Sequence, residues 1–373
     1  MCTHLAISCV SKVMREYSLA LLISAALTYM LTPLIRNLAL KFRAVAVVRD
    51  RDIHQEETAR WGGIAMWLSM GATFLAIHNL ELLGKAYGRE LLGIYLAATF
   101  VLIIGALDDR FELDAITKLA GQGLAAGILL LFGIQLLWLP INGIIILPTN
   151  IGQFLTVLIV LVIINAVNFV DGLDGLAAGI VSISAAAFFG FSYLLAVENG
   201  FSRAGAPSLT SAVMVGVCLG FLPHNMYPAR IFMGDSGSMF LGLLLAASAI
   251  TLMGQIDANA VFAEEIGPAA LPLLLPLAVL SVPLLDFGLA VIRRIRQGKS
   301  PFAPDKEHLH HKLISKGHSQ IRSTVILYLL TATLALPSMI SAFTSILNAF
   351  VIFLLLSLIT FVIYFKTSRK EKV

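Results

Sequence analysis

Residues 344–365 read TSILNAFVIFLLLSLITFVIYF and contain no charged side chain. A helix rises about 1.5 Å per residue, so this run is long enough to cross the roughly 30 Å hydrocarbon core of a bilayer. Apolar runs of comparable character recur back to Leu19. Backbone polar groups in lipid must bond to one another, and the runs are too long for the alternating strands of a membrane barrel, so each run predicts a helix.

The composition of the whole chain agrees with this reading. Of 373 residues, 58% are hydrophobic and 13% are charged, whereas a soluble domain carries about 25% charged residues. A soluble enzyme, a secreted disulfide scaffold and a disordered chain are therefore excluded. Cys2, Cys9 and Cys218 are too widely spaced to suggest a zinc or disulfide framework. The net charge of +4 is spread over separate loops and does not indicate a nucleic-acid partner.

The sequence predicts an all-α polytopic membrane protein, with residues 1–373 forming one integral-membrane domain. We expect about eleven transmembrane helices; ten is the alternative, because one run is short and the last break is weak. The expected spans are 18–34, 62–78, 91–107, 119–135, 151–167, 176–196, 209–222, 239–254, 269–290, 324–341 and 344–365.

The basic residues give the expected orientation. With the N-terminus outside, inner segments hold 21 of the 26 Lys and Arg residues and outer segments hold 5, so the positive-inside rule favours N-out and C-in. An Asn-Gly turn near 137–148 predicts a small periplasmic β-hairpin. The inner segments that we expect to form catalytic loops are 35–61, 108–118, 168–175, 223–238 and 291–323.

Carboxylates, an amide and imidazoles gather at the inner ends of four predicted spans. Each group alone is explained by a helix cap, a turn or an interfacial loop. Four such groups at one face favour a functional site, because ionisable side chains beside membrane helices are costly. The residues are Asp108, Asp109, Asn168, Asp171, Asp174, Asp235, His308, His310 and His311.

Clustered carboxylates repel one another unless a cation neutralises them. Oxygen ligands suit Mg²⁺, which usually binds one or two carboxylates and completes its shell with water and phosphates. The helices expected to begin at Gly175 and Ser236 offer N-terminal amides to a phosphate, and the loop with three His residues adds positive charge. These features predict a metal-assisted site for a phosphorylated substrate at headgroup depth.

From about Asp50 to Gly317 the chain resembles the polyprenyl-phosphate N-acetylhexosamine-1-phosphate transferases (glycosyltransferase family 4), which start bacterial cell-envelope glycans. The first inner loop keeps His54 and Arg60 but lacks the Pro usually found before that Arg. The resemblance rests on the Gly62-Gly63 pair, the Asp-Asp pair with downstream Lys118 and Gln122, and the segments NAVNFVDGLDGL, PARIFMGDSGSMFLG and SPFAPDKEHLHHKL.

The segment PDKEHLHHKL is similar to the branch of this family that transfers GlcNAc-1-phosphate. The resemblance implies transfer of that group from a UDP-N-acetylhexosamine to undecaprenyl phosphate, with release of UMP. The product would start an O-antigen, common-antigen or teichoic-acid glycan. It also implies Mg²⁺ as cofactor, with Mn²⁺ as a substitute, and a bacterial inner-membrane enzyme whose active site faces the cytoplasm. Family members are often homodimers, so a homodimer is an expectation as well.

The resemblance also assigns roles residue by residue. Asp171 and Asp235 are expected to hold the metal against the pyrophosphate, and Asp174 is expected to lie beside the uracil. Asp108 and Asp109 are expected to orient or deprotonate the lipid phosphate, and the sequence leaves the division between them open. The other expected substrate-binding residues are Asn168, Asn225, Lys118, Gly234, His308, His310 and His311.

A lipid phosphate is already anionic near pH 7, so a single displacement is favoured over a covalent aspartyl-phosphate route. The alternative class is an ion-coupled transporter or a lipid-linked-sugar flippase, because intramembrane carboxylates also mark ion pathways. Transporters place such groups near the membrane midplane and often on inverted repeats. Here the carboxylates gather at one face and no repeat is visible, which favours the transferase.

Overall fold

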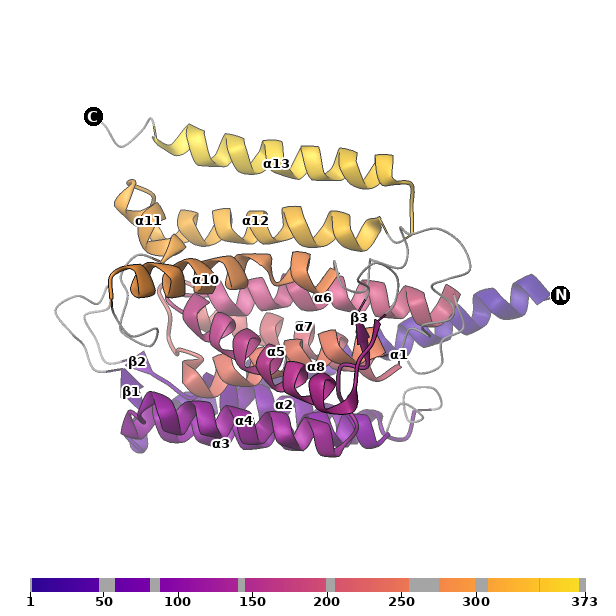
Figure 1. Cartoon of the computed structure of the whole chain (residues 1–373), viewed down its shortest axis with the longest axis horizontal. Coiled ribbons are helices and arrows are strands. Elements are labelled where there is room, and N and C mark those ends of the chain that lie inside the picture. The colour runs from indigo at the N-terminus through magenta and orange to yellow at the C-terminus, as the bar shows by residue number, and fades with distance from the viewer. Residues whose placement is uncertain are drawn as a thin grey trace.

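The computed structural model describes residues 2–46, 58–80, 88–139, 145–198, 205–254, 275–298, 308–341 and 343–368. Long helices lie side by side along the long axis of the molecule, and two short strand pairs lie at opposite ends of it (Figure 1). The helices are α1 (Cys2–Lys41), α2 (Gly62–Ile77), α3 (Arg89–Phe111), α4 (Ala115–Leu131), α5 (Thr149–Val170), α6 (Leu176–Glu198), α7 (Gly205–Asn225), α8 (Gly234–Gly254), α10 (Ser281–Arg296), α11 (Leu309–Ser315), α12 (Gln320–Ile340) and α13 (Ile346–Ser368).

Within the described residues, eight helices are long and apolar enough to cross a membrane, and α2 and α4 are shorter apolar helices. Each of the eleven predicted spans overlaps described helical residues. The prediction of an all-α polytopic membrane protein is therefore confirmed, while the number of crossings and the orientation stay predictions. The eight segments are Met14–Lys41, Arg89–Phe111, Thr149–Val170, Leu176–Leu194, Gly205–Asn225, Gly234–Gly254, Gln320–Ile340 and Ile346–Phe365.

Both strand pairs are antiparallel and very short. β1 (Val45–Ala46) pairs with β2 (Thr58–Ala59), and residues 47–57, including the family's His54, lie outside the described residues. β3 (Trp138–Leu139) pairs with β4 (Ile145–Ile146), which confirms the predicted hairpin near 137–148. Its assignment to the periplasmic side remains a prediction.

The inner segments are less loop-like than we predicted. In 108–118, α3 continues to Phe111, and α4 begins at Ala115 with the Asp114 carboxylate accepting the Thr117 amide at 3.0 Å. Segments 223–238 and 291–323 likewise contain helix ends, and the second also contains α11. Helices extend into these segments because an apolar run ends at the edge of the hydrocarbon, whereas helical hydrogen bonding continues until a cap stops it. The assignment of these segments to the inner side and to catalysis stays a prediction.

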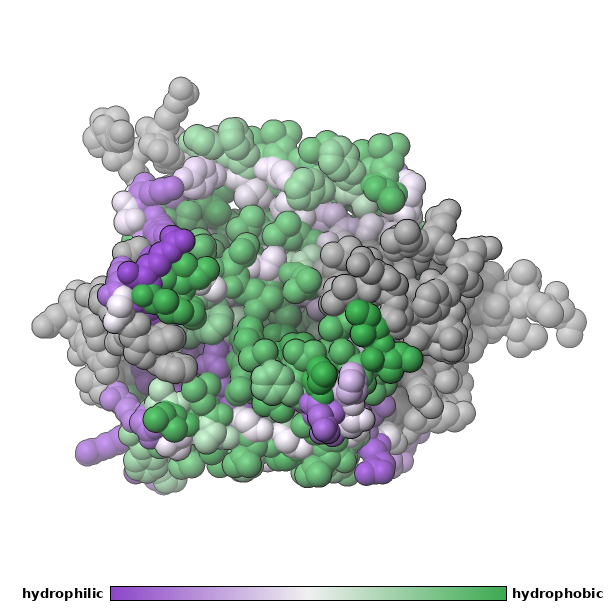
Figure 2. Space-filling model, viewed as in Figure 1, coloured by the Kyte–Doolittle hydropathy of each residue, from purple (hydrophilic) through white to green (hydrophobic). Residues whose placement is uncertain are grey.

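Helix α8 lies at the centre of the bundle and α13 at its edge. In the spanning window of α8, 94% of the residues are buried, against 6% in that of α13, which packs on α12. Figure 2 shows an apolar band across the middle of the visible face, with hydrophilic side chains nearer to its ends. Exposed apolar side chains on outer helices are what lipid contact requires, so the centre of the protein is set by α8 and its neighbours.

Two glycines bring neighbouring helices onto the first turn of α8. A Cβ atom at Gly63 of α2 would lie 2.3 Å from the Gly237 backbone nitrogen, and one at Gly105 of α3 would lie 2.6 Å from the Asp235 carbonyl carbon. Small residues of this kind allow helix backbones in membranes to approach closely. The start of α8 is thereby fixed next to the end of α3, where the predicted Asp pair lies.

Candidate active site

Asp109 holds the N-terminus of α8. Its two carboxylate oxygens accept the backbone amides of Asp235 at 2.8 Å and of Ser236 at 3.1 Å. Gly234, just before them, has a φ of +70°, and a Cβ atom there would lie 2.4 Å from Asp109 Oδ2. The expectation that a helix start at Ser236 offers free amides to a phosphate is therefore wrong, because the Asp109 carboxylate already accepts the amides of Asp235 and Ser236.

Asp108, the other member of the pair, faces a different neighbour. Its Oδ2 lies 2.5 Å from Lys118 Nζ, and its Oδ1 accepts the Leu113 amide at 2.8 Å. The same Lys118 ammonium lies 2.8 Å from Asp235 Oδ2. The Lys118 side chain is 28% exposed and that of Asp235 is 26% exposed, so this bridge between α3, α4 and α8 is open to a ligand.

Asn168, from the last turn of α5, orients the Asp235 carboxylate. Its Nδ2 donates to Asp235 Oδ1 at 3.0 Å and to Ser238 Oγ at 2.8 Å. One turn earlier, Asn165 Nδ2 donates to Gln122 Oε1 at 2.7 Å, which ties α5 to α4. Asp235 is therefore contacted from both α4 and α5.

Asp171 lies in the turn between α5 and α6, beside the same carboxylates. Burial, and then the charges of Asp235 and Asp109, raise the pKa of Asp171 to about 8, while the Arg60 guanidinium opposes the shift. Carboxylates whose charges repel one another are stabilised either by binding a proton or by a nearby cation.

The donor set has the chemistry of a hard-cation site. In the part of the chain that the structure describes, no group of three or more His, Cys, Asp or Glu residues could by itself hold a metal ion. Mg²⁺ commonly takes only one or two carboxylates and completes its shell with water and phosphate oxygens. The Asp171 and Asp235 carboxylates have the donor chemistry that such an ion accepts, and the charge of Asp235 acts on Asp171.

Asp174 and Asn225 brace the loop that precedes α8. Asp174 Oδ2 accepts the Ala229 amide at 2.9 Å. Asn225 Oδ1 accepts the Gly175 amide at 3.1 Å, and its Nδ2 donates to the Ile231 carbonyl at 2.9 Å. These contacts hold residues 226–233 against the 171–175 turn, so both side chains shape the site through its backbone.

The three predicted imidazoles lie on and just before α11, close to the turn that carries Asp171. A Cβ atom at Gly172 would lie 2.5 Å from the His310 ring, which shows how closely the two segments approach. The rings of His308 and His310 are parallel at 5.6 Å, and those of His310 and His311 are 4.3 Å apart.

Not every imidazole adds positive charge. Burial, and then the neighbouring His311, lower the pKa of His310 to about 4, so His310 is neutral at pH 7. The positive charge expected of this basic loop therefore does not come from His310. A neutral ring still offers one hydrogen-bond donor and one acceptor to a sugar or a phosphate.

Sequence reasoning missed Asp286, a buried residue of α10. Its Oδ2 lies 3.1 Å from His308 Nδ1, and its Oδ1 accepts the Leu309 amide at 2.9 Å, so it fixes the start of α11. Nearby, the Arg294 guanidinium lies 4.9 Å from the Phe169 ring centroid. A lone carboxylate inside the predicted span 269–290 was the signal that could have identified Asp286.

Known proteins resemble this chain over most of its length. Glycosyl transferase family 4 matches residues 91–253, a range that includes Asp108, Asp171 and Asp235. A decaprenyl-phosphate N-acetylglucosaminephosphotransferase of Mycolicibacterium smegmatis is 43% identical over 86% of this chain and 81% of its own length. The Mycobacterium tuberculosis protein with the same description is 44% identical over 88% and 83%.

A more distant relative extends the similarity beyond mycobacteria. A probable undecaprenyl-phosphate N-acetylglucosaminyl 1-phosphate transferase of Bacillus subtilis is 30% identical over 90% of this chain and 88% of its own length. The two mycobacterial names specify a decaprenyl rather than the expected undecaprenyl carrier. The chain is thus a multi-pass bacterial membrane protein, and it belongs to the polyprenyl-phosphate N-acetylhexosamine-1-phosphate transferases of glycosyl transferase family 4.

Proposed function

We propose that this protein transfers GlcNAc-1-phosphate from UDP-GlcNAc to a polyprenyl phosphate at the cytoplasmic face of the membrane. The observation that carries the proposal is the joining of Asp108, Lys118 and Asp235 from three helices at one partly exposed point. The names of the two mycobacterial relatives favour decaprenyl phosphate as the acceptor. The product would begin a cell-envelope polysaccharide.

In the proposed reaction, an oxygen of the lipid phosphate attacks the β-phosphorus of UDP-GlcNAc. The new P–O bond forms as the bond from that phosphorus to the bridging oxygen breaks, and UMP leaves with the bridging oxygen. The nucleophile is already anionic, so the protein needs mainly to position the two phosphates and to neutralise charge. Lys118 is suited to this role because its ammonium lies at the exposed edge of the cluster.

Asp171 and Asp235 would hold Mg²⁺, which supplies charge neutralisation at the pyrophosphate when it is bound. Asn168 keeps the Asp235 carboxylate oriented through the 3.0 Å hydrogen bond. Two carboxylates and phosphate oxygens are an ordinary ligand set for this ion, and Mn²⁺ accepts the same oxygen ligands.

The Asp pair divides into two roles in this proposal. Asp108 and Lys118 position the acceptor phosphate, while Asp109 is a positioning residue that holds α8 and with it Asp235. Asp174, Asn225 and Gly234 shape the loop on the nucleotide side. His308, His310 and His311 would contact the sugar or the pyrophosphate.

The test is UMP release by the purified protein in detergent, with UDP-GlcNAc and either decaprenyl or undecaprenyl phosphate. We expect Mg²⁺-dependent UMP release by the wild type and none by Asp235→Asn. Asp114→Asn is the matched control, because Asp114 caps α4 on the exposed surface and Asn caps equally well. Detergent supports no ion gradient, so a transporter or flippase would give no UMP. Absence of UMP with every acceptor, or full turnover by Asp235→Asn, would overturn the proposal.

A further inference from the structure

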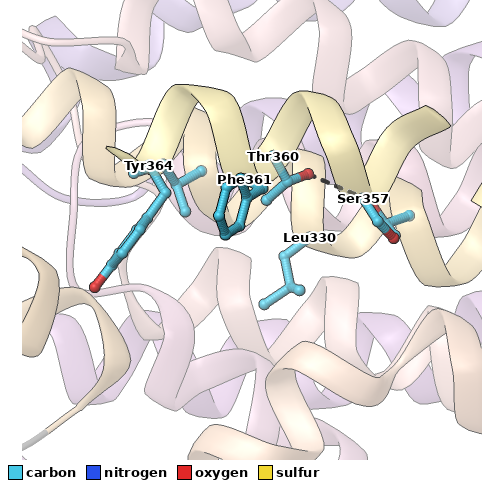
Figure 3. A pocket seen from close by; sticks show the side chains of 7 residues that line it. Leu330, Ser357, Thr360, Phe361 and Tyr364 are labelled. Atoms are coloured by element: carbon cyan, nitrogen blue, oxygen red, sulfur yellow. Dashed lines mark hydrogen bonds between the residues drawn. The ribbon is translucent and has the colours of Figure 1, made fainter. Parts of the chain in front are cut away.

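A groove opens between α12 and α13, on the side of the bundle formed by the two C-terminal helices. Its volume is about 280 Å³. Figure 3 shows the Leu330 and Phe361 side chains extending into the space between the helices, with Tyr364 toward one end. The lining residues are Ile326, Leu330, Thr333, Ser357, Thr360, Phe361 and Tyr364.

The end of the groove at Tyr364 is basic and polar. Lys316 Nζ, in the turn between α11 and α12, donates to the Tyr364 hydroxyl at 3.1 Å and lies 5.8 Å from the ring centroid. The centroids of the His318 and Tyr364 rings lie 5.2 Å apart. Lys316 is exposed, and an ammonium carries three donors, so it can bind an anion while it keeps the contact to Tyr364.

Between residues 318 and 324, four buried polar atoms have no hydrogen-bond partner in the described structure. They are His318 Nδ1, Gln320 Oε1, Ser323 Oγ and Thr324 Oγ1. Ser323 precedes Ile326 by three residues and Leu330 by seven, which places it on the helix face that lines the groove. Buried polar atoms nearly always have a partner in the protein or in ordered water, so these atoms show that this end of the groove is polar.

We propose that the α12–α13 groove binds one anionic phospholipid of the bilayer. An acyl chain would lie along Ile326, Leu330 and Phe361, and the lipid phosphate would bind the Lys316 ammonium and the Tyr364 hydroxyl. Charge complementarity selects an anionic headgroup over a zwitterionic one, because the described groups at this end are basic or neutral donors.

The occupant is a bilayer lipid and not the acceptor lipid of the proposed reaction. The Asp108, Lys118 and Asp235 cluster belongs to α3, α4 and α8, whereas α13 packs on α12 and α12 packs on α6, α10 and α11. A phosphate bound beside Tyr364 would thus contact α13 and the C-terminal end of α11, whereas the Asp108, Lys118 and Asp235 cluster lies on α3, α4 and α8. The site therefore goes beyond the proposed function.

Lipid retention by the full-length protein, measured by native mass spectrometry with phosphatidylglycerol and phosphatidylcholine, tests the proposal. We expect the wild type to retain one phosphatidylglycerol in preference to phosphatidylcholine, and Lys316→Ala to weaken this retention about five-fold. Leu330→Trp, which fills the groove, should abolish it. Arg296→Ala is the control, because it removes another exposed basic side chain, at the end of α10 outside the groove.

Thermal unfolding of each variant checks that it is folded, and the surface variant Lys316→Ala carries the test if Leu330→Trp fails to fold. Equal retention of the two phospholipids, or equal weakening by Lys316→Ala and Arg296→Ala, would overturn the proposal. Stoichiometric displacement of phosphatidylglycerol by decaprenyl phosphate would overturn it as well, because the groove would then be an acceptor site. UMP release, measured separately, reports on the proposed function independently of these outcomes.

Discussion

Replacing Asp109 by Ala should destabilise the protein far more than replacing Asp108 by Ala. Asp109 accepts the amides of Asp235 and Ser236, so Asp109→Ala leaves two backbone donors at the start of α8 without acceptors. Each such loss at a buried position costs about 1–3 kcal/mol. The two together lower the free energy of unfolding by about 2–6 kcal/mol.

The free energy of unfolding of the conservative variant Asp109→Asn should lie between those of the wild type and Asp109→Ala. Asp109→Asn keeps one acceptor oxygen and turns an NH₂ group toward one of the two amides. Asp108→Asn, in contrast, keeps an oxygen for the Leu113 amide and removes the charge that faces Lys118. We therefore expect Asp108→Asn to unfold near the wild-type temperature while its UMP release falls strongly.

The assay pairs the midpoint of thermal unfolding in detergent with UMP release for the same four variants: Asp109→Ala, Asp109→Asn, Asp108→Ala and Asp108→Asn. The expected midpoints rank Asp109→Ala lowest and Asp108→Asn highest. If Asp109→Ala unfolded at the wild-type temperature yet lost all activity, Asp109 would act in the chemistry and the capping role would be refuted.

Three further predictions concern the surroundings of the site. Lys118→Met should lower UMP release about 100-fold or more, because it removes a positioned charge at a phosphoryl-transfer site. Wild-type turnover by this variant at saturating substrate would show that Lys118 does not position a phosphate. Gly172→Ala should reduce turnover because its Cβ atom would lie 2.5 Å from the His310 ring. Gly123→Ala is the control and should retain activity, because its Cβ atom would meet nothing within 4 Å. Equal rates in the two variants would argue against the close approach of α11. In the unfolded chain His310 binds a proton below its ordinary pKa of 6.5, whereas in the folded chain its pKa is about 4. The free energy of unfolding should therefore fall as the pH drops from 6.5 to about 4, by about 3 kcal/mol at most. His310→Gln should flatten that pH dependence of the unfolding midpoint, and an unchanged slope would contradict the assignment.

The positions of the helices could be predicted from the sequence because bilayer thickness sets the length of an apolar run. The quoted run 344–365 overlaps α13, and the 149–170 helix was predicted within a few residues. Helix ends could not be placed this way. They depend on caps such as Asp114, which act beyond the apolar run.

The candidate site residues could be identified from their spacing and from the family resemblance. The residues with which they interact could not be identified in this way. Asp108 and Asp109 are adjacent in a helix with 3.6 residues per turn, so their side chains point about 100° apart and meet different neighbours. Only the placement of Lys118 and of the α8 amides distinguishes the two. Asp286 was missed because its partner, His308, is 22 residues away along the chain.

The central claim is that carboxylates from separate segments form one site for a divalent cation, and Mn²⁺ binding measured by electron paramagnetic resonance tests it most directly. With UDP-GlcNAc present, we expect one Mn²⁺ per chain in the wild type and in Asp114→Asn. Binding should be weaker by at least about ten-fold in Asp171→Asn and in Asp235→Asn. Unchanged Mn²⁺ affinity in the double variant Asp171→Asn/Asp235→Asn would contradict the account.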